Sequence, residues 1–255
     1  MPEKVSCVSI AKNEQNTISR CLDSVGWMDE IIVVDTGSTD HTVEICHQYG
    51  VKVFEIKWTG FGNAKRFAVE QASYDWIFSI DCDEVMTSDL QKKIRRILEQ
   101  PELFEGYCIK RCTYYLGKQI NWCGWNHDYP LRLFNRKYGT FNNAIVHEAV
   151  CLCGRKGRIE EHLLHYSYPD IKTHISKINH YTELGAKRLL EKGKKSSPVA
   201  AYGHGLVKFI KMYFIQQGFL DGIEGLILAI VSAFGVHLKY LKLWQKKRET
   251  TLHQQ

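Results

Sequence analysis

Residues 76–86, WIFSIDCDEVM, join an apolar run to a cluster of negative charge, and this stretch decides the fold. The run is apolar at Ile77, Phe78 and Ile80 and is followed by Asp81, Asp83 and Glu84. The apolar part is typical of a parallel strand that is covered on both faces. Carboxylates this close repel one another, and burying them costs free energy unless a positive charge lies among them. The stretch therefore predicts a strand whose carboxyl end holds a divalent cation.

Strand and helix signals alternate through the chain before this stretch. Short apolar runs lie at 5–11, 30–35 and 51–56, and segments with helical spacing lie between them at 16–25, 36–50 and 63–73. Strands that alternate with short helices indicate βαβ units and a parallel sheet. From about residue 106 the pattern changes to hairpin-like alternation, which predicts mixed β structure added to one edge of that sheet. After residue 168 the chain reads as helical, with a Ser-Ser-Pro break at 196–198.

Composition limits the class of protein. The 255 residues are 44% apolar and 24% charged, as in an ordinary globular α/β domain. A net charge of +6 fits an anionic substrate or a membrane surface and does not require nucleic acid. Nine cysteines lie scattered without the spacing of a zinc module, so we expect free thiols in a reducing cytosol. The first residues lack the apolar stretch of a secretory signal.

Carboxylates gather at the ends of the expected strands. Ligands of open parallel sheets bind beyond the carboxyl ends of the strands, and Glu14, Asp35 and the Asp81/Asp83 pair all fall there. In an extended chain Asp81 and Asp83 would project to one side, about 7 Å apart, where they could serve a hard cation. The alternative is an ordinary helix start, with Asp83 or Glu84 capping the segment at 88–100.

Three motifs in this order carry a family resemblance. They are VSIAKNEQNTISRCLDSV at 8–25, DEIIVVDTGSTDHTVEI at 29–45 and IFSIDCDE at 77–84. Together they resemble the inverting glycosyltransferases of family 2. GWNHDYPLRLFNR at 124–136 and VHE at 146–148 resemble the lipopolysaccharide core branch of that family, the WaaE/KdtX type.

The resemblance implies a GT-A nucleotide-sugar-binding fold, which is Rossmann-like, with a mostly parallel sheet flanked by helices. Residues 1–168 would form the catalytic domain, with 1–105 as the nucleotide-sugar-binding half and 106–168 as the acceptor-side half. Residues 169–255 would form a C-terminal helical, membrane-associating extension.

The resemblance also assigns residues to the donor. Ala11, Asn13 and Glu14 would wall the nucleotide, Asp35 would accept hydrogen bonds from uracil or ribose, and Lys65 would lie near the nucleotide. Asp83 would hold the metal, Mg²⁺ or Mn²⁺, and Asp81 would lie nearer the ribose as a second ligand. Cys82 stands where this branch usually has alanine, which keeps the residue small.

The acceptor side requires a base, since inversion needs deprotonation of the attacking hydroxyl. Glu148 is the first choice and Asp128 the second. His147 is a candidate metal ligand, and Arg132 could hold a diphosphate or an acceptor phosphate through its planar fork. Ordinary packing is the alternative for each. His147 and Glu148 are adjacent, and adjacent residues of a strand point to opposite faces.

The expected function is transfer of a hexose, glucose by resemblance, from a UDP-sugar to a lipid-anchored saccharide such as lipopolysaccharide inner core. The alternatives are a family 2 transferase that builds capsule or another glycan from a different nucleotide sugar, and a non-catalytic membrane scaffold. A dinucleotide-dependent dehydrogenase is excluded, since no G-x-G-x-x-G follows the first strand. We expect no nucleic-acid partner, and the oligomeric state stays open.

The segment 205–248 is the most apolar part of the chain. Its charge-free stretch at 225–236 is shorter than the roughly 20 residues of a spanning helix. Several glycines and the charges of Asp221 and Glu224 also oppose a span. Lysines flank the apolar pieces at 208, 211, 239, 242, 246 and 247. This pattern favours helices that lie in a membrane interface, peripheral on the cytoplasmic face of the inner membrane. The alternative is a helical hairpin packed on the catalytic domain or on a second subunit.

Overall fold

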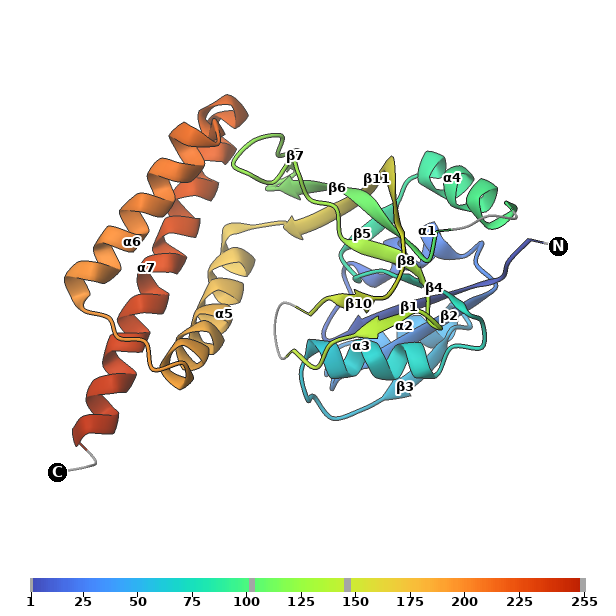
Figure 1. The fold of residues 1–255 in the computed structure, drawn as a ribbon, viewed down its shortest axis with the longest axis horizontal. Helices are drawn as coiled ribbons and strands as arrows, with labels where there is room; N and C mark the ends of the chain where they lie inside the picture. Colours follow the sequence, from blue (N-terminus) through green and yellow to red (C-terminus); the bar gives the residue numbers. More distant parts are fainter. Residues whose placement is uncertain (1, 101–103, 145–147, 253–255) are drawn as a thin grey trace. The chain divides into compact units, whose positions relative to one another are not determined.

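The computed structural model describes residues 2–100, 104–144 and 148–252 (Figure 1). Two compact units divide the chain: Met1–Cys112 with His127–His165, and Thr113–Asn126 with Tyr166–Gln255. The chain passes between the units within β6 (Gly106–Tyr115), between Asn126 and His127, and within β11 (Lys156–Tyr168). Residues 113–126 group with the C-terminal helices. The single domain boundary expected after residue 168 stays a prediction.

The first unit is built on a parallel sheet, as the alternating pattern predicts. Its strands are β1 (Val5–Ala11), β2 (Glu30–Asp35), β3 (Lys52–Glu55) and β4 (Trp76–Ser79). They pair in parallel in the order β3-β2-β1-β4. The order reverses at β1, so the ends of β1, β2 and β4 share one rim where ligands of such sheets bind.

Antiparallel strands extend this sheet beyond β4, and this confirms the expected mixed β structure. The added strands are β8 (Leu131–Asn135), which pairs with β4, followed by β6, β11 and β5 (Glu84–Met86). A separate hairpin is formed by β9 (Gly139–Phe141) and β10 (Val150–Leu152).

Helices cover both faces of the sheet (Figure 1). They are α1 (Ile18–Val25), α2 (Thr42–Gln48) and α4 (Ser88–Leu98) on one face and α3 (Phe61–Glu70) on the other. In β1, the neighbours Cys7 and Val8 belong to different clusters, because successive strand residues point to opposite faces. The architecture is that of the GT-A-like α/β class, as expected.

Glu30 links four segments at the amino end of β2. Its carboxylate accepts hydrogen bonds from Ser6 Oγ at 2.6 Å, Lys52 Nζ at 2.5 Å, Ser73 N at 2.7 Å and Ser73 Oγ at 2.7 Å. Burial by itself raises the pKa of Glu30, but the bonds from Lys52, Ser6 and Ser73 outweigh it and lower the pKa from 4.5 to about 2.

Replacing Glu30 with glutamine is expected to lower the free energy of unfolding by about 3 kcal/mol at pH 7, from 1.36 kcal/mol per pKa unit. Because the folded pKa is depressed, this stability is present above pH 4.5 and is lost as pH falls toward about 2. Urea denaturation at several pH values measures it. The matched control is Glu44→Gln, whose exposed pair with His41 should contribute little; equal losses in the two variants would contradict the assignment.

The second unit is helical, as the sequence predicts. It contains β7 (Lys118–Gln119), α5 (Ile171–Glu191), α6 (Pro198–Ile210), the π-helical turn η1 (Lys211–Ile215), the 3₁₀ turn η2 (Gly218–Asp221) and α7 (Gly222–Leu252). The Ser-Ser-Pro break starts α6, where Ser197 accepts a hydrogen bond from the Ala200 amide and Pro198 takes the first position. Asp221 is buried and accepts the amides of Asn121 and Trp122, which holds the loop after β7 against the turn.

The long apolar segment runs from α6 through η1 and η2 into α7, and residues 222–252 form one continuous helix. Gly225 lies so close to the carbonyl of Gly218 that a Cβ would meet it at 2.0 Å, so this glycine permits close packing instead of breaking the helix. By length and composition alone, Gly218–Glu249 could cross a membrane, which by itself is weak support for a membrane location.

Candidate active site

The loops after β1 and β2 form one hydrogen-bonded cradle. Asp35, at the end of β2, accepts the amides of Gly37 at 2.9 Å and Ser38 at 2.8 Å, and the Ser38 hydroxyl at 2.5 Å. Gly37 has φ of +100°, a conformation that glycine adopts without strain. Asn13 crosses from the other loop, since its Oδ1 accepts the Thr39 amide at 2.8 Å.

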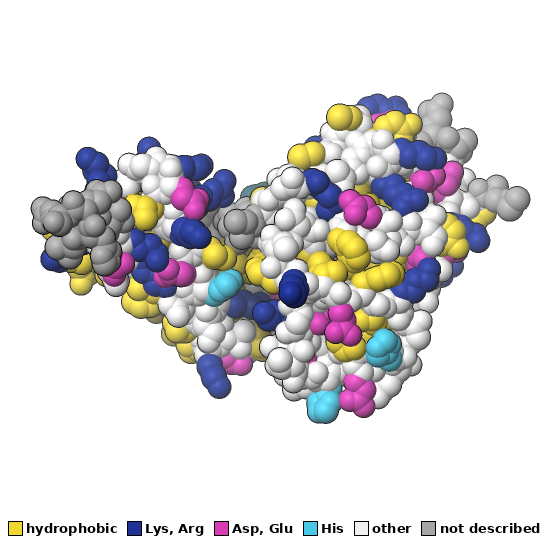
Figure 2. All heavy atoms as spheres, turned by 90° about the horizontal axis from the view of Figure 1, so that it is seen from below, with side chains coloured by type: hydrophobic (Ala, Val, Ile, Leu, Met, Phe, Trp, Pro, Cys, Tyr) yellow, Lys and Arg dark blue, Asp and Glu magenta, His cyan; other side chains and the backbone are white. Residues whose placement is uncertain are grey.

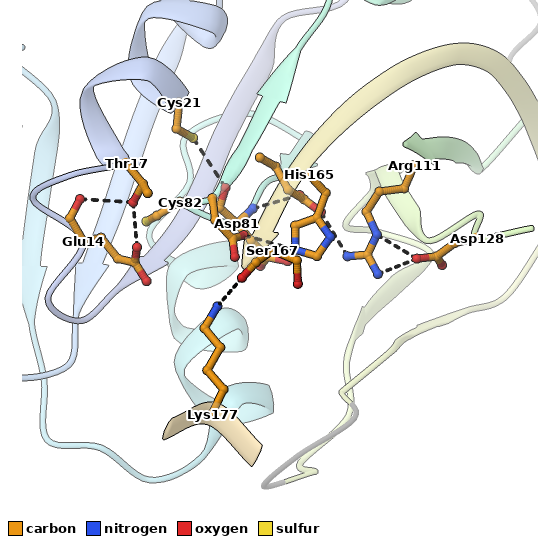
Figure 3. A network of polar contacts seen from close by, with 12 residues as sticks. Glu14, Thr17, Cys21, Asp81, Cys82, Arg111, Asp128, His165, Ser167 and Lys177 are labelled. Carbon is orange, nitrogen blue, oxygen red and sulfur yellow. Dashed lines mark hydrogen bonds and ion pairs between the residues drawn. The ribbon is translucent and has the colours of Figure 1, made fainter. Parts of the chain in front are cut away.

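Two further predicted donor residues, Ala11 and Glu14, lie at the end of β1 and in the loop after it. Ala11 is buried and its carbonyl accepts from the amide and the hydroxyl of Thr36. Glu14 accepts from Thr17 Oγ1 at 2.6 Å and donates its amide to Thr42 Oγ1 at 2.7 Å (Figure 3). The structure thus brings the two loops together at the rim and makes them rigid.

The Asp-Cys-Asp segment forms a turn, not an extended strand. The Glu84 amide donates to the Asp81 carbonyl at 2.9 Å, which closes a four-residue turn. The expectation that Asp81 and Asp83 project side by side from a strand is therefore wrong. Helix α4 is capped by Thr87, which accepts from the Leu90 amide, so Asp83 and Glu84 are not its caps.

Asp81 lies between two cations. Its Oδ1 is 2.7 Å from Lys65 Nζ and its Oδ2 is 2.5 Å from Arg132 Nη2. Burial by itself raises the pKa of Asp81, but Arg132 and Lys65 overcome it and hold the pKa well below the usual range. Asp81 is therefore ionised at neutral pH.

Glu84 extends the charge network away from Asp81. Its side chain is fully buried, and its Oε1 lies 2.5 Å from Arg132 Nη2 and 3.1 Å from Arg111 Nη1. Arg111 in turn donates from Nε and Nη2 to Asp128 Oδ2, at 2.7 and 2.5 Å (Figure 3). Carboxylates and guanidinium groups thus alternate from Asp81 to Asp128.

The protein itself supplies much of the positive charge that these carboxylates need. A divalent cation would therefore add to the charge that Lys65, Arg132 and Arg111 already place beside them. Arg132 was expected to face a phosphate, but its guanidinium is 6% exposed and is engaged by Asp81 and Glu84. Its Nε is buried without a hydrogen-bond partner among the described residues.

Lys65 connects the donor side to the first-choice base. It lies on α3, is 4% exposed, and its Nζ is 2.7 Å from both Asp81 Oδ1 and Glu148 Oε1. Burial by itself lowers the pKa of Lys65, but Asp81 and Glu148 raise it further than burial lowers it, so the ammonium form is kept. Glu148 thus joins the same charge network, whereas Asp128 lies at its far end.

Asp83 faces a histidine that lies outside the motifs that carry the family resemblance. His165 Nε2 lies 3.5 Å from Asp83 Oδ1, and both side chains are largely buried. His165 is on β11, in register with Glu84 on β5. The pairing of β11 with β5, two strands far apart in sequence, brings His165 beside Asp83. The motifs assign no ligand role to His165, Glu84 or Arg111, so the sequence alone did not reveal these contacts.

A carboxylate oxygen and an imidazole nitrogen that converge are donors suited to Mn²⁺ or a similar divalent ion. The described residues contain no group of three or more His, Cys, Asp and Glu side chains arranged as a complete metal site. Asp83 and His165 therefore fit a site whose other ligands come from diphosphate oxygens and water. His147, the predicted histidine ligand, lies outside the described residues.

Comparison with known proteins agrees with these observations. The family described as "Glycosyl transferase family 2" matches residues 6–156. An uncharacterized glycosyltransferase of Rickettsia typhi is 33% identical over 94% of this chain and 87% of its own length. The lipopolysaccharide core biosynthesis glycosyltransferase LpsC of Rhizobium meliloti is 28% identical over 95% of this chain and 92% of its own.

Among solved structures, S. aureus TarS 1–349 in complex with UDP-GlcNAc has a TM-score of 0.48 at 13% identity, covering 97% of this chain and 92% of that chain. Glucosyl-3-phosphoglycerate synthase from Mycobacterium tuberculosis, in complex with Mn²⁺, UDP and glucosyl-3-phosphoglycerate, has a TM-score of 0.36 at 25% identity. That match covers 44% of each chain.

Proposed function

The chain belongs to glycosyltransferase family 2, and from this premise we propose an inverting, metal-dependent transfer of a hexose from a UDP-sugar to a lipid-anchored saccharide. The observation that carries the proposal is the meeting of Asp81, Lys65 and Glu148 at the carboxyl end of β4, with Asp83 and His165 beside them. A donor site and a candidate base thus share one charged network.

The cradle formed by the loops after β1 and β2 supports nucleotide binding. Asp35 already accepts three hydrogen bonds, and a carboxylate has about four acceptor positions. One position is therefore left for a donor group of uracil or ribose. Asn13 and Glu14 hold the neighbouring loop through Thr39 and Thr42, so the nucleotide would meet a preformed wall.

Asp83 would hold the divalent ion together with His165, and Asp81 would lie nearer the ribose. When bound, the ion supplies positive charge that stabilises the departing diphosphate. Lys65 is a buried cation at the same place, and its contact with Asp81 keeps that carboxylate oriented. Arg132 acts indirectly, because it positions Asp81 and Glu84.

Glu148 would deprotonate the acceptor hydroxyl as it attacks the anomeric carbon from the side opposite the diphosphate. The pair with Lys65, whose Nζ lies 2.7 Å from Oε1, fixes the position of the Glu148 carboxylate. Asp128 is the second candidate, but the fork of Arg111 holds its Oδ2 through two hydrogen bonds. That difference favours Glu148.

The acceptor proposal depends on likeness to LpsC, whose name places it in lipopolysaccharide core biosynthesis. We propose a lipopolysaccharide inner core acceptor, glucose as the sugar, and the WaaE/KdtX branch. The enzyme would work peripherally on the cytoplasmic face of the inner membrane. The alternative is a family 2 transferase that builds capsule or another surface glycan from a different nucleotide sugar. A non-catalytic scaffold would not need to retain this charged network.

A panel of nucleotide sugars tests the proposal. We expect hydrolysis or transfer from UDP-hexoses, with turnover at least roughly tenfold lower after chelation of divalent ions and restored by Mn²⁺ or Mg²⁺. Asp83→Ala should reproduce the loss, whereas Asp89→Ala, an exposed aspartate on α4, should not. Turnover that is unaffected by chelator and by Asp83→Ala would remove the metal from the mechanism, and turnover of other nucleotides alone would reject UDP.

A further inference from the structure

The outer side of the α6–α7 hairpin is apolar and exposed. On α6, Val199, Tyr202 and Leu206 are 82%, 70% and 60% exposed, at a spacing that places them on one helix face. At the turn, Ile215 is 72% exposed, and Ile223 at the start of α7 is 61% exposed. Soluble helices turn such stripes toward a core, but the described part of the chain leaves the outer side of this hairpin uncovered.

The inner side of the hairpin is also apolar and tightly packed. Ala201 and Gly205 of α6 are buried, and a Cβ on Gly205 would come within 3.1 Å of the Ala233 carbonyl on α7. Leu228 and Ala229 of α7 are fully buried. A helix that is apolar on both sides is typical of a protein core or of a membrane, and here one side remains outside the core.

The unit that carries this surface is strongly basic. Residues 113–126 and 166–255 contain 15 lysines and arginines against six aspartates and glutamates, a net charge of +9, whereas the rest of the chain has 19 against 22, a net charge of −3. Figure 2 shows Lys and Arg side chains spread over the helical unit with hydrophobic side chains between them. All of the chain's positive balance therefore lies with the exposed apolar surface.

Part of this positive charge, that of Lys208, Lys211 and Lys239, lies on the hairpin itself, and no ion pair among the described residues neutralises it. Burial and, next, the charge of Lys211 lower the pKa of Lys208, and Lys239 adds to the effect. An anionic surface would relieve this repulsion. A second copy of the same unit would increase it, because two groups of +9 would meet.

Helix α5 opposes insertion of α7 across a bilayer. Glu183 of α5 pairs with Lys242 and Lys246 of α7, and Lys242 donates to the Asn179 carbonyl at 2.8 Å. A crossing α7 would have to leave α5, whose Ile178 packs against Gly235 within the apolar stretch, or carry polar side chains of α5 into hydrocarbon with it. Only the outer side of the hairpin is available to lipid without breaking these contacts.

We propose that the outer side of the α6–α7 hairpin binds an anionic bilayer and lies in its interface, with Leu206, Ile215 and Ile223 entering the acyl boundary and the nearby lysines contacting headgroup phosphates. Amphipathic helices of this kind bury their apolar face without spanning the membrane. The inference deepens the membrane location proposed above and rests on it, but it does not depend on which sugar is transferred.

Flotation of the full-length protein with vesicles tests the surface. Vesicles of phosphatidylcholine with phosphatidylglycerol should bind the protein, pure phosphatidylcholine should bind it at least roughly tenfold less, and added salt should weaken binding. The double variant Leu206→Asp, Ile215→Asp should reduce binding on the order of tenfold or more. The matched control is Tyr138→Ser, a half-exposed aromatic in the other unit, which should bind as wild type does.

Several results would overturn the inference. They are undiminished flotation of the double variant, equal binding to both vesicle types, or retention of the protein in vesicles after an alkaline carbonate wash, which removes interfacial but not spanning proteins. A soluble dimer that the double variant dissociates, with no vesicle binding, would make a second copy the partner. A second double variant, Lys208→Gln with Lys211→Gln, removes charge without changing the apolar side. It should weaken binding to the anionic vesicles.

Hydrolysis of the UDP-sugar in solution separates the two proposals. The double variant should hydrolyse the donor as wild type does, because neither substituted residue belongs to the charged network. Wild-type protein that binds vesicles but hydrolyses no nucleotide sugar would reject the proposed function and leave the bilayer inference standing. Normal hydrolysis without vesicle binding would reject the bilayer inference and leave the proposed function standing.

Discussion

Glu148→Gln is expected to lower kcat by about a thousandfold while leaving the Kd of the nucleotide sugar nearly unchanged. A positioned general base contributes roughly 10²–10⁴-fold, and an amide cannot take the acceptor's proton. The amide oxygen can still accept from Lys65, so the geometry around Asp81 is kept. Steady-state kinetics with a lipid-linked acceptor measures kcat, and calorimetric titration with UDP measures the donor site.

The control for this prediction is Glu160→Gln, an exposed carboxylate that pairs with Arg158 and should retain wild-type kcat. Asp128→Asn should have a smaller effect than Glu148→Gln, because Arg111 holds Asp128 at the far end of the network. If Asp128→Asn abolished turnover and Glu148→Gln did not, the two roles would be exchanged.

Arg132→Met is expected to lower the free energy of unfolding by about 3–5 kcal/mol, because removing one partner from a buried ion network leaves uncompensated charge. Asp81 and Glu84 would then lose the guanidinium nitrogen that lies 2.5 Å from each. Urea denaturation measures the loss. The depressed pKa of Asp81 means that this stability is present at neutral pH and is lost in acid.

The matched control is Lys137→Met, just after the same strand, whose exposed pair with Asp75 should contribute less than about 1 kcal/mol. Adding Glu84→Gln to Arg132→Met should restore part of the stability, because it removes one of the stranded charges. An unfolding midpoint of Arg132→Met equal to that of wild type would show that the network does not hold the site together.

The strand and helix pattern, the switch to mixed β structure and the helical C-terminus were all predictable from residue order. Periodicity of apolar residues depends on local geometry, which the chain expresses wherever it lies. The rim carboxylates were predictable too, because Asp35, Asp81 and Asp83 stand at strand ends. The role of Gly225 was not predictable, because it serves close packing that only the neighbouring residues reveal.

The partners of these carboxylates were not predictable in the same way. Lys65 was expected near the nucleotide, yet it bridges Asp81 and Glu148, and Arg132 turns toward Asp81 and Glu84 instead of a free phosphate position. His165 stands outside the motifs that carry the resemblance. It reaches Asp83 because β11 pairs with β5, and strand pairing between distant segments leaves no local pattern in the sequence.

Residue order alone determined an α/β fold with acidic strand ends, because hydrophobic spacing and turn residues act over a few neighbouring positions, and its motifs carried the resemblance to family 2. Tertiary structure alone decided which cation meets which carboxylate and which apolar side remains uncovered. Ion pairs and burial depend on distances of a few ångströms between segments that lie tens of residues apart, and those distances exist only once the chain has folded.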